Sequence, residues 1–177
     1  MKLYKLTTQD NKTKNDTLWA PEVTHTAKES GDGLCSGSWI HAYSHPLVAM
    51  IMNPNHANIR NPKLWLAEGA PGCYDGQLKL GCKSLTTVRE LIVPVISLES
   101  NVVFAIDIAL AVFNDASFAE WANGWKSGGN RSCAAAYAAA DAAADAAYAA
   151  KYAAADFNLI NTLETTAKEL GVTWEME

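Results

Sequence analysis

The sequence WIHAYSHPLVAMIM, residues 39–52, contains a strand, a helix cap and a helix in direct succession. Residues 39–43 alternate in side-chain type, and a strand places alternate side chains on opposite faces. Ser44 carries the hydroxyl of a helix N-cap, and Pro46 suits the first turn, where its missing N–H is harmless. Residues 47–52 are therefore predicted to form a short apolar helix after the strand.

Outward from this block, the first half of the chain has the pattern of a sheet. Strands are expected at residues 2–8, 19–26, 63–69 and 77–91, with a glycine- and proline-containing turn at 69–76. The last of these segments is long enough for one long strand or a bent pair of strands.

The second half changes to helical patterns. Residues 102–113 are apolar on nearly all sides, which predicts a buried helix. A shorter helix carries Phe118, Trp121 and Trp125, and Gly124 is expected to end it. The two halves together predict an α+β fold with a small mixed or antiparallel sheet, helices and a long C-terminal helix.

That C-terminal helix rests on the most biased segment of the chain. Sixteen of the twenty-two residues in 134–155 are alanine, which has the best intrinsic helix propensity. Apolar residues continue at helical spacing beyond this segment, so helix is expected from Ser132 to Leu170, with its end at Gly171. Such a helix is longer than a small domain, so it either projects outward or kinks near Asp156 and folds back.

One face of the predicted helix is pure alanine, and the other carries larger side chains. The larger side chains include Tyr137, Asp141, Asp145, Tyr148 and Tyr152. A smooth alanine face lets another backbone approach closely. It fits packing on the same chain or self-association into a homo-oligomer, and its composition also resembles ice-binding helices. The opposite stripe is predicted to face water or a partner.

Composition narrows the classes of function. The chain carries a net charge of −5, and its Lys and Arg residues are scattered, which argues against a nucleic-acid partner. Its four cysteines lie far apart and no leader pattern precedes them, which indicates a reduced protein of the cytoplasm. No apolar run approaches the roughly 20 residues that cross a bilayer. We expect residues 1–127 to form a mixed α/β domain, and residues 128–177 to form a linker and the long helix, standing apart or packed on that domain.

Two groups of residues are candidates for ligand binding. Trp39, His41 and Tyr43 share one strand face and, with Tyr4 and Glu68 on neighbouring strands, fit the stacking of a base or a nicotinamide ring. The same side chains equally fit the packing of a half-buried sheet.

The second candidate group is the segment Gly128-Gly129-Asn130-Arg131-Ser132. It opens onto a helix N-terminus, where free amides and the helix dipole favour an anion, and Arg131 adds a charge. A flexible joint with an N-cap is the alternative interpretation.

Signals for catalysis and for metals are weak. His41 and His45 stand four apart, but a predicted strand-to-helix boundary separates them, so no metal site is predicted. No nucleophile signature of the Gly-x-Ser-x-Gly kind occurs, so catalytic residues stay unassigned, and no cofactor is expected.

Several ordered blocks resemble a family of uncharacterised bacteriophage and prophage proteins, in which a domain of this kind precedes an alanine-rich tail. The blocks are residues 2–7, 39–43 with 46–47 after them, 53–54, 62–69 and 80–90. A fainter similarity to small ADP-ribosyltransferase folds assigns roles to Tyr4, His41, Tyr43 and Glu90, and implies an enzyme that uses a nucleotide such as NAD.

The leading hypothesis is a phage-type accessory protein that binds a host protein, such as a defence protein, or a nucleotide signal without catalysis. Two alternatives stay open, namely the nucleotide- or NAD-using enzyme and a self-assembling structural protein.

Overall fold

The computed structural model describes residues 1–28, 31, 33–112, 115–129, 131 and 157–176. The chain divides into two compact units by its contacts. Unit 1 contains residues 1–94 and the C-terminal segment from Thr173, and unit 2 contains residues 95–172. The sequence predicted a division between residues 127 and 128, whereas these contacts group residues 95–127 with residues 128–172.

Unit 1 contains the described strands and one α-helix. Its strands are β1 (Lys2–Thr7), β2 (Lys12–Thr13), β3 (Thr17–Leu18), β4 (Val23–Thr26), β5 (Ile40–Ala42), β6 (Lys63–Asp75) and β7 (Lys79–Leu91), and its α-helix is α1 (Pro46–His56). Unit 2 contains α2 (Leu98–Val112), α3 (Ala116–Lys126) and α5 (Leu159–Glu169). The expected α+β class is therefore confirmed.

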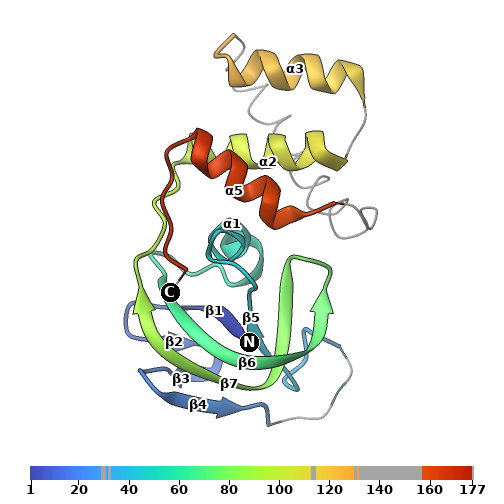
Figure 1. Ribbon diagram of the computed structural model, residues 1–177. Helices are drawn as coiled ribbons and strands as arrows, with labels where there is room; N and C mark the ends of the chain where they lie inside the picture. The colour runs from blue at the N-terminus through green and yellow to red at the C-terminus, as the bar shows by residue number, and fades with distance from the viewer. Residues whose placement is uncertain (29–30, 32, 113–114, 130, 132–156, 177) are drawn as a thin grey trace. The chain divides into compact units, whose positions relative to one another are not determined.

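The main sheet of unit 1 is antiparallel and closes on itself. Strands β6 and β7 form a long, strongly curved hairpin (Figure 1), with β1 paired to β6, and with β4 and β5 paired to the other edge of β7. Tyr4 and Tyr43 exchange two backbone hydrogen bonds of 2.9 Å, which join β1 to the residue directly after β5. A closed arrangement leaves few free strand edges and fixes β5 from both sides.

The core of unit 1 gathers side chains from strands that are distant in sequence. Its fully or almost fully buried members are Leu3, Trp19, Ala42, Ala67, Leu80, Cys82 and Leu85, with Ile40 packed against them. Ile40 and Ala42 face this cluster, so the alternation of β5 turns His41 to the opposite side of the sheet.

Helix α1 is longer than the sequence predicted, and its cap is a different residue. His45, not Ser44, is the N-cap, and its Nδ1 accepts a hydrogen bond of 3.2 Å from Leu47 N. The helix continues past Pro54 to His56, although it was expected to end at Met52. Proline near the last turn removes only one backbone hydrogen bond, so the helix tolerates it there.

The expected turn at residues 69–76 is mostly strand. Strand β6 continues to Asp75, and the turn to β7 begins at Gly76, whose φ is +55°. The β6–β7 register shifts on both sides of Pro71. Bulges of this kind accommodate a proline that cannot donate to the ladder, so a Gly- and Pro-rich sequence stays extended.

Unit 2 is helical in its described part. Helices α2 and α3 share a cluster of buried residues, namely Val103, Ile106, Ala122 and Trp125. Asp107 of α2 accepts hydrogen bonds of 2.7 Å from Lys126 Nζ of α3 and from Thr166 Oγ1 of α5. One carboxylate therefore connects all three helices.

The ends of these helices bear on two expectations. Gly124 lies inside α3, which continues to Lys126 because glycine in the last turn costs little before Gly128 adopts a φ of +85°. Asn158 is an extended N-cap whose Oδ1 accepts from Asn161 N. The chain is therefore not helical at residues 157–158, which fits the expected alternative of a break near Asp156 and not one unbroken helix up to Leu170. Gly171, with a φ of +68°, follows the end of α5 as expected.

The alanine-rich segment lies outside the described residues. The predicted interaction side chains Tyr137, Asp141, Asp145, Tyr148 and Tyr152 lie there too, as does the predicted alanine face. Their roles stay predictions. In the described part of the chain, helices fall short of the length and apolar character that crossing a bilayer requires.

Candidate functional site

The strand face expected to bind a ligand is only partly assembled. Trp39 packs closely along the sheet. A Cβ added at Gly72 would lie 3.0 Å from the Trp39 ring, and a Cβ added at Gly81 would lie 2.9 Å from the Trp39 Cβ. Lys83 Nζ lies 3.9 Å from the centre of the Trp39 ring. The indole therefore has sheet and ammonium contacts already, as expected for a packing residue.

Tyr4 is bridged to Tyr43 through the backbone, but its hydroxyl is bound to the C-terminal segment, and Glu68 lies away from the other candidates. Tyr4 is 2% exposed, and its hydroxyl donates to the carbonyl oxygen of Met176 at 2.9 Å. Glu68 is exposed on β6, opposite Lys2 of β1. Of the five predicted residues, His41 and Tyr43 are the two that the structure places beside further reactive side chains.

Those side chains form what we call the Cys35–Lys79 corner, which consists of Cys35, His41, Tyr43, His56 and Lys79. The side chains come from the loop before β5, from β5 and the residue after it, from the end of α1 and from the start of β7. Lys79 Nζ donates to Cys35 Sγ across 3.6 Å. Lys79 is only 8% exposed, whereas the Cys35 thiol is exposed.

Specific contacts hold the loop that carries Cys35. His41 Nε2 donates to the Leu34 carbonyl oxygen at 2.5 Å, directly before Cys35 in the chain. The Leu34 side chain covers Gly81, where an added Cβ would lie 2.6 Å from it. On the other side of the loop, Lys83 Nζ donates to the Ser38 carbonyl oxygen at 2.9 Å. The thiol is therefore placed by the sheet on both sides of its loop.

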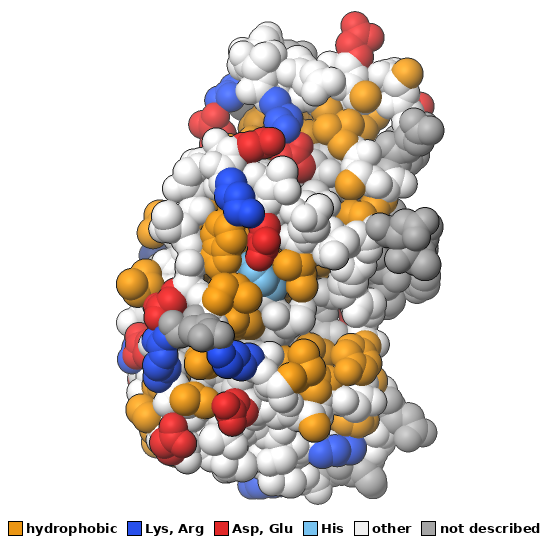
Figure 2. Space-filling view, viewed as in Figure 1, with side chains coloured by type: hydrophobic (Ala, Val, Ile, Leu, Met, Phe, Trp, Pro, Cys, Tyr) orange, Lys and Arg blue, Asp and Glu red, His pale blue; other side chains and the backbone are white. Residues whose placement is uncertain are grey.

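The surroundings of His41 are positively charged, although the whole chain is acidic. Burial lowers the pKa of His41 most, and the Leu34 carbonyl opposes this shift. The charges of Lys79, Lys5 and Lys14 lower the same pKa further. On the face shown in Figure 2, by contrast, basic and acidic side chains are interspersed.

His56 and Tyr43 form the aromatic part of the corner. Their rings stack at a centroid distance of 6.1 Å and an interplanar angle of 12°. Burial raises the pKa of Tyr43 to about 12, which keeps the phenol neutral. Burial and then Lys79 lower the pKa of His56, while Asp75 raises it. Within the described residues, His56 Nδ1 is buried without a hydrogen-bond partner.

The predicted anion segment is described only in part. Gly128 and Gly129 follow the C-terminus of α3, while Asn130 and Ser132 lie outside the described residues. Arg131 forms an ion pair with Glu99 and lies 5.0 Å from the centre of the Trp125 ring. The guanidinium therefore already has an acidic and an aromatic partner.

The residues that the transferase similarity singled out do not converge. Glu90 forms an ion pair of 3.3 Å with Lys63. Glu90 lies near the C-terminal end of β7, whereas Gly81, which pairs with His41, lies near the N-terminal end of the same strand. The Tyr4 hydroxyl points to the C-terminal segment.

Comparisons with known proteins assign neither a family nor a function to the chain. No known protein family, curated protein or solved structure matches the chain. In the part that the structure describes, no three His, Cys, Asp or Glu side chains are arranged to hold a metal ion.

Three members of the corner were not predicted from the sequence. Cys35, His56 and Lys79 are separated by more than twenty residues each, and no motif connects them. Lys79 lies two residues before Gly81 and therefore on the same face of β7. This position indicates a site residue only once the β5–β7 register places Gly81 opposite His41.

Proposed function

We propose that this chain is a phage-type accessory protein of the bacterial cytoplasm that acts by binding rather than by catalysis. Its ligand is a small anion of the nucleotide class, and the Cys35–Lys79 corner is the binding site. The resemblance of residues 39–43 and 80–90 to phage proteins supports the setting. A host-protein partner for the alanine-rich segment stays a prediction on residues outside the described part.

The observation that carries the proposal is the incomplete hydrogen bonding of Lys79. An ammonium group has three donors, and burial makes an unsatisfied donor costly. Lys79 is 8% exposed, and among the described residues its hydrogen-bond acceptor is a thiol sulfur 3.6 Å away. A phosphate oxygen is a far stronger acceptor for such a donor.

The charges around the corner favour an anionic ligand, and the rings of His56 and Tyr43 favour a ligand that carries a nucleobase. His41 is influenced by three lysines, so an anionic group gains attraction as well as hydrogen bonds. His56 is half-buried, stacked on Tyr43 and electrostatically coupled to Lys79. Base stacking on such rings contributes about 1–3 kcal/mol for each base.

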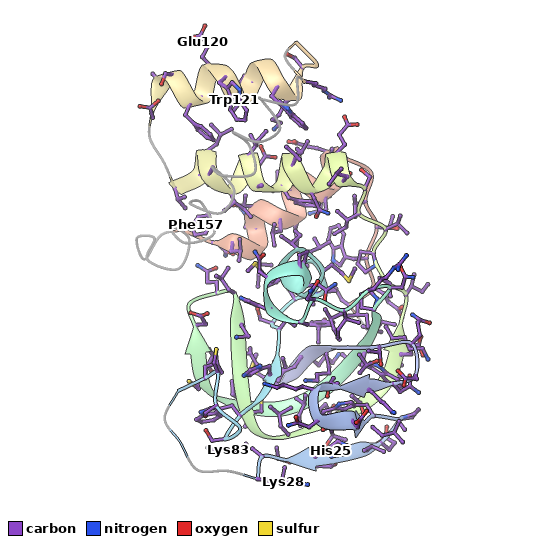
Figure 3. All side chains as sticks on the ribbon, turned by 180° about the vertical axis from the view of Figure 1, so that it is seen from behind. His25, Lys28, Lys83, Glu120, Trp121 and Phe157 are labelled. Atoms are coloured by element: carbon purple, nitrogen blue, oxygen red, sulfur yellow. The ribbon has the colours of Figure 1, made fainter. Side chains whose placement is uncertain are left out.

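Titration calorimetry with ATP, with adenosine as a second probe, tests the proposal. Lys79→Gln removes the central charge, and Lys28→Gln makes the same change at an exposed lysine beyond the end of β4, visible in Figure 3. We expect the intact chain to bind ATP, and Lys79→Gln to weaken that binding about tenfold or more, as the loss of a charged hydrogen bond does.

Lys28→Gln should leave the affinity for ATP unchanged, and adenosine should bind less tightly than ATP. Absence of ATP binding by the intact chain, or equal losses in the two variants, contradicts the proposal. Circular dichroism of both variants checks that each is folded.

A further inference from the structure

The thiol of Cys35 differs from the other described thiols in its surroundings. Cys35 is exposed, Cys73 is partly buried on β6, and Cys82 is fully buried in the core. A buried ammonium donates a hydrogen bond to the Cys35 sulfur, and both sides of its loop are bound to the sheet. Exposed thiols beside Lys, Arg or His are the ones that react selectively.

We propose that Cys35 is a covalent modification site that undergoes reversible exchange with an anionic low-molecular-weight disulfide. The partner class follows from the corner. Lys79 Nζ lies 3.6 Å from the Cys35 sulfur, and the charges of Lys79, Lys5 and Lys14 act on His41 next to this loop. These charges attract a disulfide whose ends carry carboxylates. Access follows from the exposure of the thiol.

The exchange is a single displacement. The Cys35 sulfur, after losing its proton to water, attacks one sulfur of the disulfide. A new S–S bond forms to Cys35 as the original S–S bond breaks, and the other half leaves as a thiolate that takes up a proton. Each sulfur is accounted for, since one thiol and one disulfide give one mixed disulfide and one thiol. Lys79 Nζ holds the attacking sulfur in place.

This inference does not depend on the proposed function, because its test contains no nucleotide. The reduced full-length chain is incubated with oxidised glutathione, and peptide mass mapping follows the adduct at each cysteine over time. We expect Cys35 to form the adduct about tenfold faster than Cys73, and Cys82 to stay unmodified in the folded chain. Dithiothreitol should remove the adduct.

Two further measurements test the role of Lys79. Lys79→Gln should slow the reaction of Cys35 with oxidised glutathione about fivefold, while Lys28→Gln should leave it unchanged. With bis(2-hydroxyethyl) disulfide, which is uncharged, Lys79→Gln should have a smaller effect. Cys35→Ser should abolish the fast adduct.

Three results would overturn the inference. One is a rate at Cys35 no faster than at Cys73. Another is equal loss of rate in the two lysine variants. The third is a Cys35 rate that matches the rate in the urea-unfolded chain, because then the folded corner contributes nothing.

Discussion

Asp107 in unit 2 and Lys79 in unit 1 are both largely buried charged side chains, but their hydrogen bonds differ in number and strength. Asp107 accepts two hydrogen bonds of 2.7 Å, from an ammonium and from a hydroxyl, and it connects three helices. Among the residues that the structure describes, the acceptor for Lys79 Nζ is a thiol at 3.6 Å. Removal of one partner from a well-satisfied buried charge destabilises the fold, so Asp107 has a structural role, whereas a buried charge whose acceptor is weak is available to a ligand.

The difference also appears in the groups that line a groove beside Asp107. A polar groove of about 270 Å³ in unit 2 is lined by Asp107, Lys126, Asn161, Thr162, Thr165, Thr166 and Glu169. The hydroxyls of Thr162, Thr165 and Thr166 already donate to acceptors within unit 2. The groove therefore offers few free donors, which is why we place the ligand at the Cys35–Lys79 corner.

The largest effect expected from a single buried charge concerns Lys5. Lys5 Nζ donates to the His41 carbonyl oxygen at 2.8 Å, and burial lowers its pKa from 10.5 to about 8. The unfolded chain therefore binds the proton more tightly than the folded chain. Stability should rise from pH 8 to pH 10.5 by up to about 3 kcal/mol, and the same amount is lost as the pH falls back.

Urea unfolding of the intact chain and of Lys5→Met, compared between pH 8 and pH 10, measures this contribution. Burial raises the pKa of Cys82 and of Tyr43. These two groups therefore lower the stability as the pH rises, Cys82 above about pH 9 and Tyr43 above about pH 10. Both chains contain Cys82 and Tyr43, so the difference between their unfolding free energies cancels the contributions of these two groups. A difference that does not change with pH would show that Lys5 is not buried as described.

A second prediction concerns the two contrasted charges directly. Asp107→Asn replaces a carboxylate with an amide that cannot attract Lys126, and we expect a loss of about 2 kcal/mol in stability. Lys79→Gln should cost less than about 1 kcal/mol, because a thiol is a weak acceptor. Urea unfolding with hydrogen exchange of α2, α3 and α5 peptides measures both. Equal costs would remove the distinction on which the site assignment rests.

A third prediction concerns Gly81, the glycine beneath the Cys35 loop. Gly81→Ala would place a Cβ 2.6 Å from Leu34 Cδ1 and 2.9 Å from Trp39 Cβ, so both residues must move. We expect a cost of about 1–2 kcal/mol in stability. Gly33→Ala is the control, since nothing lies within 4 Å of its added Cβ. A Gly81→Ala chain as stable as the control would mean that the loop is not held on β7.

Local sequence patterns predicted much of the fold. Alternation located β1 and β5, and the segment 77–91 was expected as a long strand or a bent pair of strands and is β7. The apolar run at residues 102–113 located α2, and the aromatic residues after it located α3. The patterns failed where tertiary structure overrides local preference. Residues 69–75 contain glycine and proline yet stay extended, because pairing with β7 and two register shifts accommodate them.

The candidate site was less predictable than the fold. His41 and Tyr43 were predicted from one strand face, because residues two apart in a strand share a face. Cys35, His56 and Lys79 join them only through the β5–β7 pairing and the packing of the α1 end on Tyr43. Long-range register of this kind is not encoded in a local pattern, which is why three of five site residues were missed.

The most direct measurement is amide chemical-shift mapping of the intact chain during titration with ATP. The account predicts perturbations at Cys35, His41, His56 and Lys79, and none of comparable size along α2 or α5. Perturbations concentrated at Asp107, Thr162 and Thr166 instead would place the ligand in the unit 2 groove and contradict the assignment.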